Sequence, residues 1–115
     1  IAMKIFHASQ VSVGEAGDYF QVLFNEGPED SANYLLIQRD FEEPVSKKCY
    51  VEDGMPVTAG HFRVSRAQLG RDRFSAELAA HRDNRLEVTF AVSEADFAEL
   101  KRVMKIMIPH VRIAE

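Results

Sequence analysis

The spacing of hydrophobic residues changes once along this chain, from every second position before Ser93 to a helical repeat after it. Apolar side chains occupy alternate positions in Arg73–Leu78 and again in Arg85–Val92, with mostly charged or polar residues between them. Successive side chains of a strand point to opposite faces, so this pattern predicts strands with one buried and one wet face. Similar segments, separated by turn residues, recur from Lys4 onward. The first part of the chain therefore predicts an antiparallel β meander.

About six or seven strands are expected in this meander. Tyr34–Ile37 is apolar on both faces, which is typical of a central strand, and Asp53-Gly54 is a strong turn signal. The expected strands are Lys4–Val13, Tyr19–Phe24, Asn33–Arg39, Cys49–Glu52, His61–Arg66, Arg73–Ala80 and Arg85–Val92.

A helix is expected over residues 93–108. Ser93 can cap its first turn, and Asp96 three residues on completes a capping box. One apolar stripe follows, and Pro109 ends the helix; the stripe consists of Phe97, Leu100, Val103, Met104 and Met107. Such a stripe needs a sheet to cover, so the predicted fold is α+β, with one C-terminal helix packed on one face of the sheet.

The length predicts a single domain over residues 1–115. We expect Met3 to be the native start after two added residues, with a sheet over 3–92, the helix over 93–108 and a tail over 109–115. No segment reaches the ~20 apolar residues of a membrane span, so no membrane partner is expected. Cys49 is the only cysteine, which excludes an internal disulfide and favours a cytoplasmic location.

Negative charge is concentrated between Glu26 and Glu43. Six acids against Arg39 give this stretch a charge of −5, while the whole chain has −4, so the remainder is close to neutral. The acids bracket the strand Asn33–Arg39 at both ends. They could bind a metal or a basic partner, or they could form a solvated rim. The net acidity argues against nucleic acid as a partner.

The sequence contains no recognisable catalytic motif. The four histidines, His7, His61, His81 and His110, lack the spacing of metal ligands on one helix or strand. Cys49 begins a short apolar strand, which is more typical of a buried thiol than of a nucleophile. We therefore expect no enzyme activity, no cofactor and no metal site.

Three stretches resemble the immunity protein 10 family, whose members are encoded beside bacterial polymorphic toxins. The most distinctive is Asn33–Arg39, with the sequence Asn-Tyr-Leu-Leu-Ile-Gln-Arg. The second runs from Tyr50-Val51-Glu52 through Asp53-Gly54 to Gly60, and the third combines Phe62–Arg66 with Arg73–Leu78. The resemblance covers most of the chain.

This resemblance implies a cytoplasmic protein that binds a cognate toxin and blocks it without catalysis. An acidic surface would suit a toxin with a basic substrate cleft, because complementary charge speeds association. Aromatic side chains beside the acids would serve as anchors. The predicted toxin-binding residues are Glu26, Glu29, Asp30, Tyr34, Asp40, Phe41, Glu42 and Glu43.

Two alternatives remain open. The chain could be a small dimeric α+β protein that binds a small molecule or serves as an enzyme subunit, or it could be a structural subunit without a ligand. An apolar patch at Ile106, Ile108, Val111 and Ile113 could support a homodimer. A deep pocket with convergent polar groups would favour the small-molecule alternative, whereas a flat acidic surface would favour the immunity protein.

Overall fold

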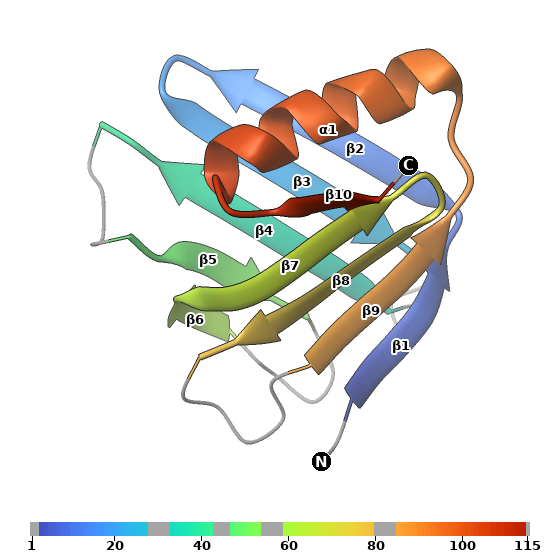
Figure 1. The fold of residues 1–115 in the computed structure, drawn as a ribbon, viewed down its shortest axis with the longest axis horizontal. Helices are drawn as coiled ribbons and strands as arrows, with labels where there is room; N and C mark the ends of the chain where they lie inside the picture. The colour runs from blue at the N-terminus through green and yellow to red at the C-terminus, as the bar shows by residue number, and fades with distance from the viewer. Residues whose placement is uncertain (1–2, 28–32, 43–46, 54–58, 80–84, 115) are drawn as a thin grey trace.

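The computed structural model describes residues 3–27, 33–42, 47–53, 59–79 and 85–114, which form two five-stranded sheets and one helix (Figure 1). Sheet A has the order β1 (Met3–Ala8), β9 (Arg85–Phe90), β8 (Arg73–Leu78), β7 (Val64–Gly70) and β10 (Arg112–Ala114). Sheet B has the order β2 (Gln10–Ala16), β3 (Tyr19–Asn25), β4 (Tyr34–Asp40), β5 (Cys49–Glu52) and β6 (Ala59–Phe62).

The α+β class is confirmed, but the expected single meander of six or seven strands is wrong. The chain passes from sheet A to sheet B at Ser9, which divides the expected strand Lys4–Val13 into β1 and β2. The Ser9 amide donates to the Asn25 carbonyl at 2.9 Å, and the Ser9 hydroxyl donates to the Glu26 carbonyl at 2.8 Å. The chain returns to sheet A at Arg63, between β6 and β7. Alternation continues through Arg63, from Phe62 to Val64, so period two does not reveal that corner. At Ser9 the alternation shifts by one position, because Phe6 and Ala8 are buried before the corner whereas Val11 and Val13 pack against the core after it.

Both ends of the chain join sheet A as parallel edge strands. β1 pairs with β9, and β10 pairs with β7 through Arg112 opposite Gln68. The expected tail over 109–115 therefore contains a strand. The expected exposed apolar patch is also wrong: Ile108 is buried, while Ile106, Val111 and Ile113 are partly buried against the core. Ile106 lies on α1, Ile108 at its C-terminal cap and Ile113 on β10, so these residues pack against the core from different elements.

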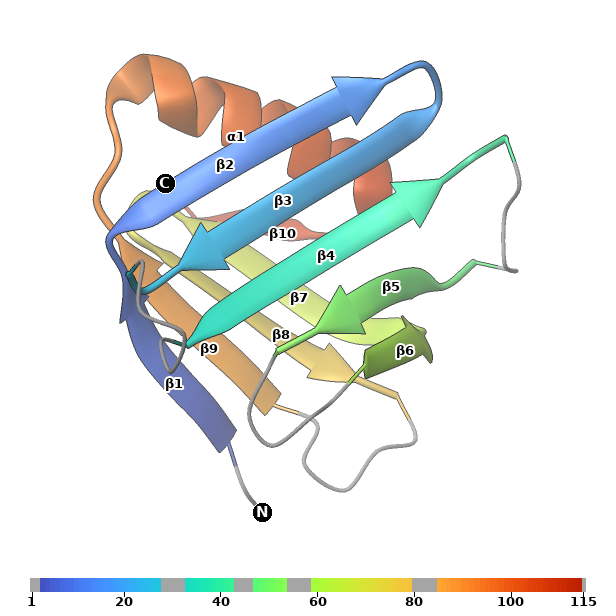
Figure 2. The same cartoon turned by 180° about the vertical axis from the view of Figure 1, so that it is seen from behind.

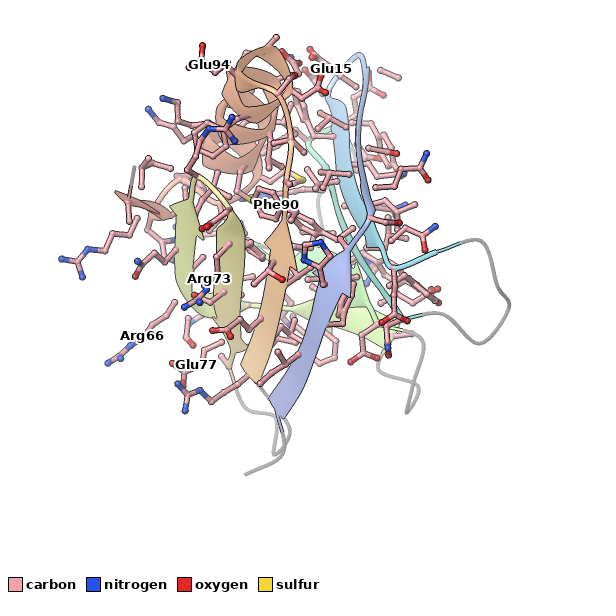
Figure 3. The ribbon with its side chains drawn as sticks, turned by 90° about the vertical axis from the view of Figure 1, so that its right-hand side faces the viewer. Glu15, Arg66, Arg73, Glu77, Phe90 and Glu94 are labelled. Carbon is pink, nitrogen blue, oxygen red and sulfur yellow. The ribbon has the colours of Figure 1, made fainter. Side chains whose placement is uncertain are left out.

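The core lies between the two sheets. Phe24 of β3 contributes the link from sheet B, because its ring lies 5.6 Å from both the Phe74 ring and the Phe90 ring of sheet A. All three rings are buried. Figure 3 shows Arg66 pointing away from the molecule on the outer side of sheet A.

The helix α1 (Glu94–Met107) begins after Ser93, whose hydroxyl accepts a hydrogen bond from the Asp96 amide at 3.1 Å. The five apolar stripe residues predicted for it are all buried. The helix contacts β2 and β3 on the same side of sheet B as sheet A, so helix and sheet A together cover the inner face of sheet B (Figure 1). The outer face of sheet B lies in front of every other labelled element in Figure 2, and no described helix or strand covers it. Within the described residues, no helix is long and apolar enough to cross a membrane.

Candidate functional site

The predicted toxin-binding residues separate into two groups at opposite ends of β4. Glu26 follows β3 near the start of β4, whereas Asp40, Phe41 and Glu42 lie at its end. Seven strand residues at ~3.3 Å each place the two groups roughly 20 Å apart. Glu29, Asp30 and Glu43 lie outside the described residues. The described acids therefore form two rims rather than one compact patch.

Glu26 organises the connection between β3 and β4. Its carboxylate accepts hydrogen bonds from the Asn33 backbone amide at 3.1 Å and from the Asn33 side-chain amide at 3.3 Å. Its backbone amide also donates to the Asn33 carbonyl at 2.9 Å. Glu26 is exposed, so it keeps a solvent-facing charge while it closes this connection.

The other rim is built around Phe41. The Phe41 amide donates to the Asp18 carbonyl at 2.9 Å, which joins the end of β4 to the turn between β2 and β3. The Phe41 ring packs edge-on against Phe20, and the Arg39 guanidinium lies 4.5 Å from the ring centroid. About a third of Phe41 is exposed. It therefore contributes to local packing and retains an accessible apolar surface between Asp40 and Glu42.

Tyr34 lies on the outer face of sheet B, which it shares with Asp40 at the other end of β4. All three tyrosines of the chain lie there: Tyr19 on β3, Tyr34 on β4 and Tyr50 on β5. They occupy the strand positions that alternate with the buried ones. We call this surface the tyrosine face, and it consists of Tyr19, Gln21, Leu23, Tyr34, Leu36, Gln38, Tyr50, Glu52 and His61.

Two tyrosines of this face hold one carboxylate. The Tyr50 hydroxyl donates to Glu52 Oε1 at 2.6 Å, and the Tyr34 hydroxyl donates to Glu52 Oε2. Both hydrogen bonds lower the pKa of Glu52, and the bond from Tyr34 has the larger effect. The hydrogen bond between Tyr34 and Glu52 also raises the pKa of Tyr34 to about 12, and burial of Tyr34 contributes a smaller part of this rise. Glu52 is therefore ionised at neutral pH, and both tyrosines are neutral donors.

The rest of the tyrosine face carries a second polar network. Gln21 Oε1 accepts hydrogen bonds from the Tyr19 hydroxyl at 3.0 Å and from the Gln38 amide at 2.9 Å. The Tyr50 and His61 rings meet edge-on at 5.5 Å. A hollow of about 220 Å³ lies among these side chains, and its lining includes Tyr19, Gln38, Tyr50 and His61. The face thus combines aromatic rings with polar groups that are already oriented.

Sequence reasoning identified Tyr34 but missed Tyr19, Tyr50 and Glu52. Their alternation with Phe20, Val51 and other buried residues was a usable signal, since it placed them on wet faces of their strands. The register between strands was also needed to show that these wet faces belong to one surface, and it follows from the tertiary structure.

A larger and more basic groove lies at the C-terminal end of α1. It has a volume of about 780 Å³, and its lining includes the basic residues Arg39, Lys47, Arg63 and His110 together with Cys49. Arg39 Nη1 donates to the Met107 carbonyl at 2.7 Å, so Arg39 stabilises the helix end. Cys49 is buried beside this carbonyl, which confirms the expected buried thiol, and burial raises its pKa to about 11.

The outer face of sheet A has mixed charge. Figure 3 shows Arg66, Arg73 and Glu77 on this side. The register places Glu77 opposite both Arg66 and Arg85, which agrees with the interleaved charges of the sequence. Among the described residues of the whole chain, no group of three or more histidine, cysteine, aspartate or glutamate side chains could hold a metal ion.

Comparison of this chain with models of protein families, with curated proteins and with solved structures finds no match. The resemblance to the immunity protein 10 family stays a prediction.

Proposed function

We propose that this chain is a non-catalytic immunity protein that binds a cognate bacterial toxin through the tyrosine face and neutralises it. The observation that carries this proposal is the collection of every tyrosine of the chain on one uncovered sheet face. Tyrosine is enriched at protein interfaces and among the residues that dominate binding energy, because its ring buries a large apolar area and its hydroxyl still finds a partner. The resemblance to immunity proteins supplies the class of partner and the cytoplasmic location.

The dimensions of the face support the involvement of the acidic rims. Sheet B has three strands of seven residues and two of four residues. At ~3.3 Å per residue and ~4.8 Å between strands, they give a projected area of about 400–500 Å². A standard protein interface covers about 800 Å² on each partner. A toxin of ordinary size would therefore extend over the ends of β4, where Glu26, Asp40 and Glu42 lie. These acids favour a basic partner, mainly by speeding its approach.

The test is toxin protection. The reading frame immediately upstream of this gene is expressed in a host with and without this protein, and surviving cells are counted. We expect rescue together with a stoichiometric complex. Tyr19→Ala should weaken that complex about tenfold or more, whereas Ile5→Ala, at an exposed position on β1 of sheet A, should not change it. A harmless neighbour, or killing despite expression of this protein, would contradict the proposal.

The acidic rim has a separate kinetic test. Reversal of Glu42 and Glu43 to lysine should slow association with a basic toxin and flatten its salt dependence, because steering is screened by salt. Glu42→Lys alone has its matched control in Glu87→Lys on β9 of sheet A, which changes the net charge by the same amount elsewhere. Association rates measured by stopped flow at two salt concentrations decide the matter. Equal rates for the rim variant and the unaltered protein would remove the rim from the mechanism.

The basic groove favours a second candidate function, the binding of a small anionic molecule. Arg39, Lys47 and Arg63 bring three permanent positive charges to one groove. Inorganic phosphate and citrate are suitable probes in a thermal unfolding assay, since a ligand that binds the native state raises Tm. A rise in Tm that is lost in Arg63→Gln would support this candidate. Arg63 does not belong to the tyrosine face, so this result would not bear on toxin binding there.

A further inference from the structure

We propose that Glu52, held between Tyr34 and Tyr50, receives an arginine or lysine side chain of the partner within the docking surface. This inference rests on the proposed function, because it assumes that a protein covers the tyrosine face. It assigns a specific recognition chemistry to a residue that lies outside the acidic stretch of the sequence.

The geometry leaves Glu52 with unused capacity to accept hydrogen bonds. Each carboxylate oxygen accepts one tyrosine hydroxyl, Oε1 from Tyr50 and Oε2 from Tyr34. An ionised carboxylate offers about four acceptor sites, so roughly two remain for an incoming donor. The two hydroxyls also fix the orientation of the side chain before a partner arrives. Less rotational entropy is then lost when the complex forms.

The surroundings of Glu52 suit a long cationic side chain. The strand register places Leu36 of β4 on one side of Glu52 and Ala59 of β6 on the other. Methylene groups of arginine or lysine could pack on this apolar surface while the charged end reaches the carboxylate.

The charge of Glu52 is compensated differently from the charges of Glu15 and Glu99. Glu15 and Glu99 each form an ion pair with Arg102 within the chain. Among the described residues, the hydrogen bonds of Glu52 come from tyrosine hydroxyls, and no lysine or arginine forms an ion pair with it. A partner that covered the tyrosine face without supplying a cation would bury this charge at a high free-energy cost. Glu52 therefore selects for a partner with a basic side chain at this point.

The first experiment uses small probes and does not require the toxin. Backbone amide shifts of the full chain are followed by NMR during titration with N-acetyl-arginine amide and, separately, with its uncharged analogue N-acetyl-citrulline amide. We expect saturable shifts in β4 and β5 with the arginine compound alone, and their loss in Glu52→Gln. Glu87→Gln on sheet A is the control and should keep the shifts. Equal responses to arginine and citrulline, or unchanged shifts in Glu52→Gln, would overturn the inference.

The second experiment uses the toxin complex and separates this inference from the proposed function. Glu52→Gln should weaken the complex at least tenfold, because the bond of a cation to a carboxylate is replaced by a neutral one. The double variant Tyr34→Phe with Tyr50→Phe, which keeps the charge but frees the carboxylate, should weaken it less. Full affinity in Glu52→Gln would refute the role of Glu52 while the immunity function stood. Arginine binding at Glu52 without toxin protection would refute the immunity function alone.

Discussion

The contact of Phe24 with Phe74 and Phe90 offers a direct test of the two-sheet arrangement. In one continuous meander, β3 and β8 would be separated by several strands and their side chains would not meet. In the observed fold, the Phe24 ring stacks on the Phe74 ring at 5.6 Å with an angle of 12° between the planes. Substitution of Phe24 or of Phe74 by leucine should therefore remove the same ring contact.

The expected magnitude follows from burial and ring contact. Both side chains are completely buried, so truncation of either one to alanine would remove about 3–5 kcal/mol. Leucine keeps most of the apolar volume, and each single change should cost roughly 1–3 kcal/mol. An aromatic pair contributes about 0.5–1.5 kcal/mol beyond its area burial. The double variant should accordingly be less destabilised than the sum of the singles by this last amount.

Urea unfolding followed by circular dichroism gives the four free energies of this cycle. Ile5→Ala combined with Phe24→Leu is the control, because Ile5 is more than half exposed on the edge strand β1. The control pair should be additive within ~0.5 kcal/mol. Additivity of Phe24 and Phe74 within the same error would refute the packing of sheet B against sheet A through these rings.

Three further predictions concern single groups. Cys49 is 3% exposed and burial raises its pKa to about 11, so Ellman's reagent at pH 8 should label it slowly in the native protein and rapidly in urea; equally fast labelling would contradict its burial. Ser93→Ala removes the acceptor for the Asp96 amide and should cost about 1 kcal/mol of unfolding free energy, whereas Ser93→Asp should restore most of it. Because the pKa of Tyr34 rises from 10.0 to about 12 on folding, the stability that its bond to Glu52 provides should be present below pH 10 and lost between pH 10 and 12. Tyr34→Phe should flatten this pH dependence of unfolding, and an unchanged slope would argue against the bond.

Local sequence signals were sufficient for the individual elements. The helix begins after Ser93 and buries the predicted stripe, because a capping hydroxyl and a 3.6-residue repeat are properties of neighbouring residues. The strand Cys49–Glu52 has the predicted bounds. The strand Tyr34–Asp40 begins and ends one residue later than the predicted strand Asn33–Arg39. Both are recognised by alternation and by nearby turn residues.

The site was less accessible from the sequence. The acidic stretch is continuous along the chain, yet Glu26 and Glu42 lie near opposite ends of sheet B, because β4 runs between them. Conversely, Tyr19, Tyr34 and Tyr50 are far apart in sequence and are gathered by hydrogen bonding between β3, β4 and β5. Which residues share a surface depends on how the strands pair, whereas the charge of a stretch depends only on which residues follow one another in the sequence.

The sequence by itself determined the α+β class, the position of the helix and which side of each strand is buried, because these follow from periodicities of two and 3.6 within short segments. Only the tertiary structure decided that the strands divide into two sheets at Ser9 and Arg63, that β1 and β10 pair in parallel with distant strands, and that Glu52 meets Tyr34. Each of these features joins residues far apart in the chain, and their pairing depends on how all the strands share one core.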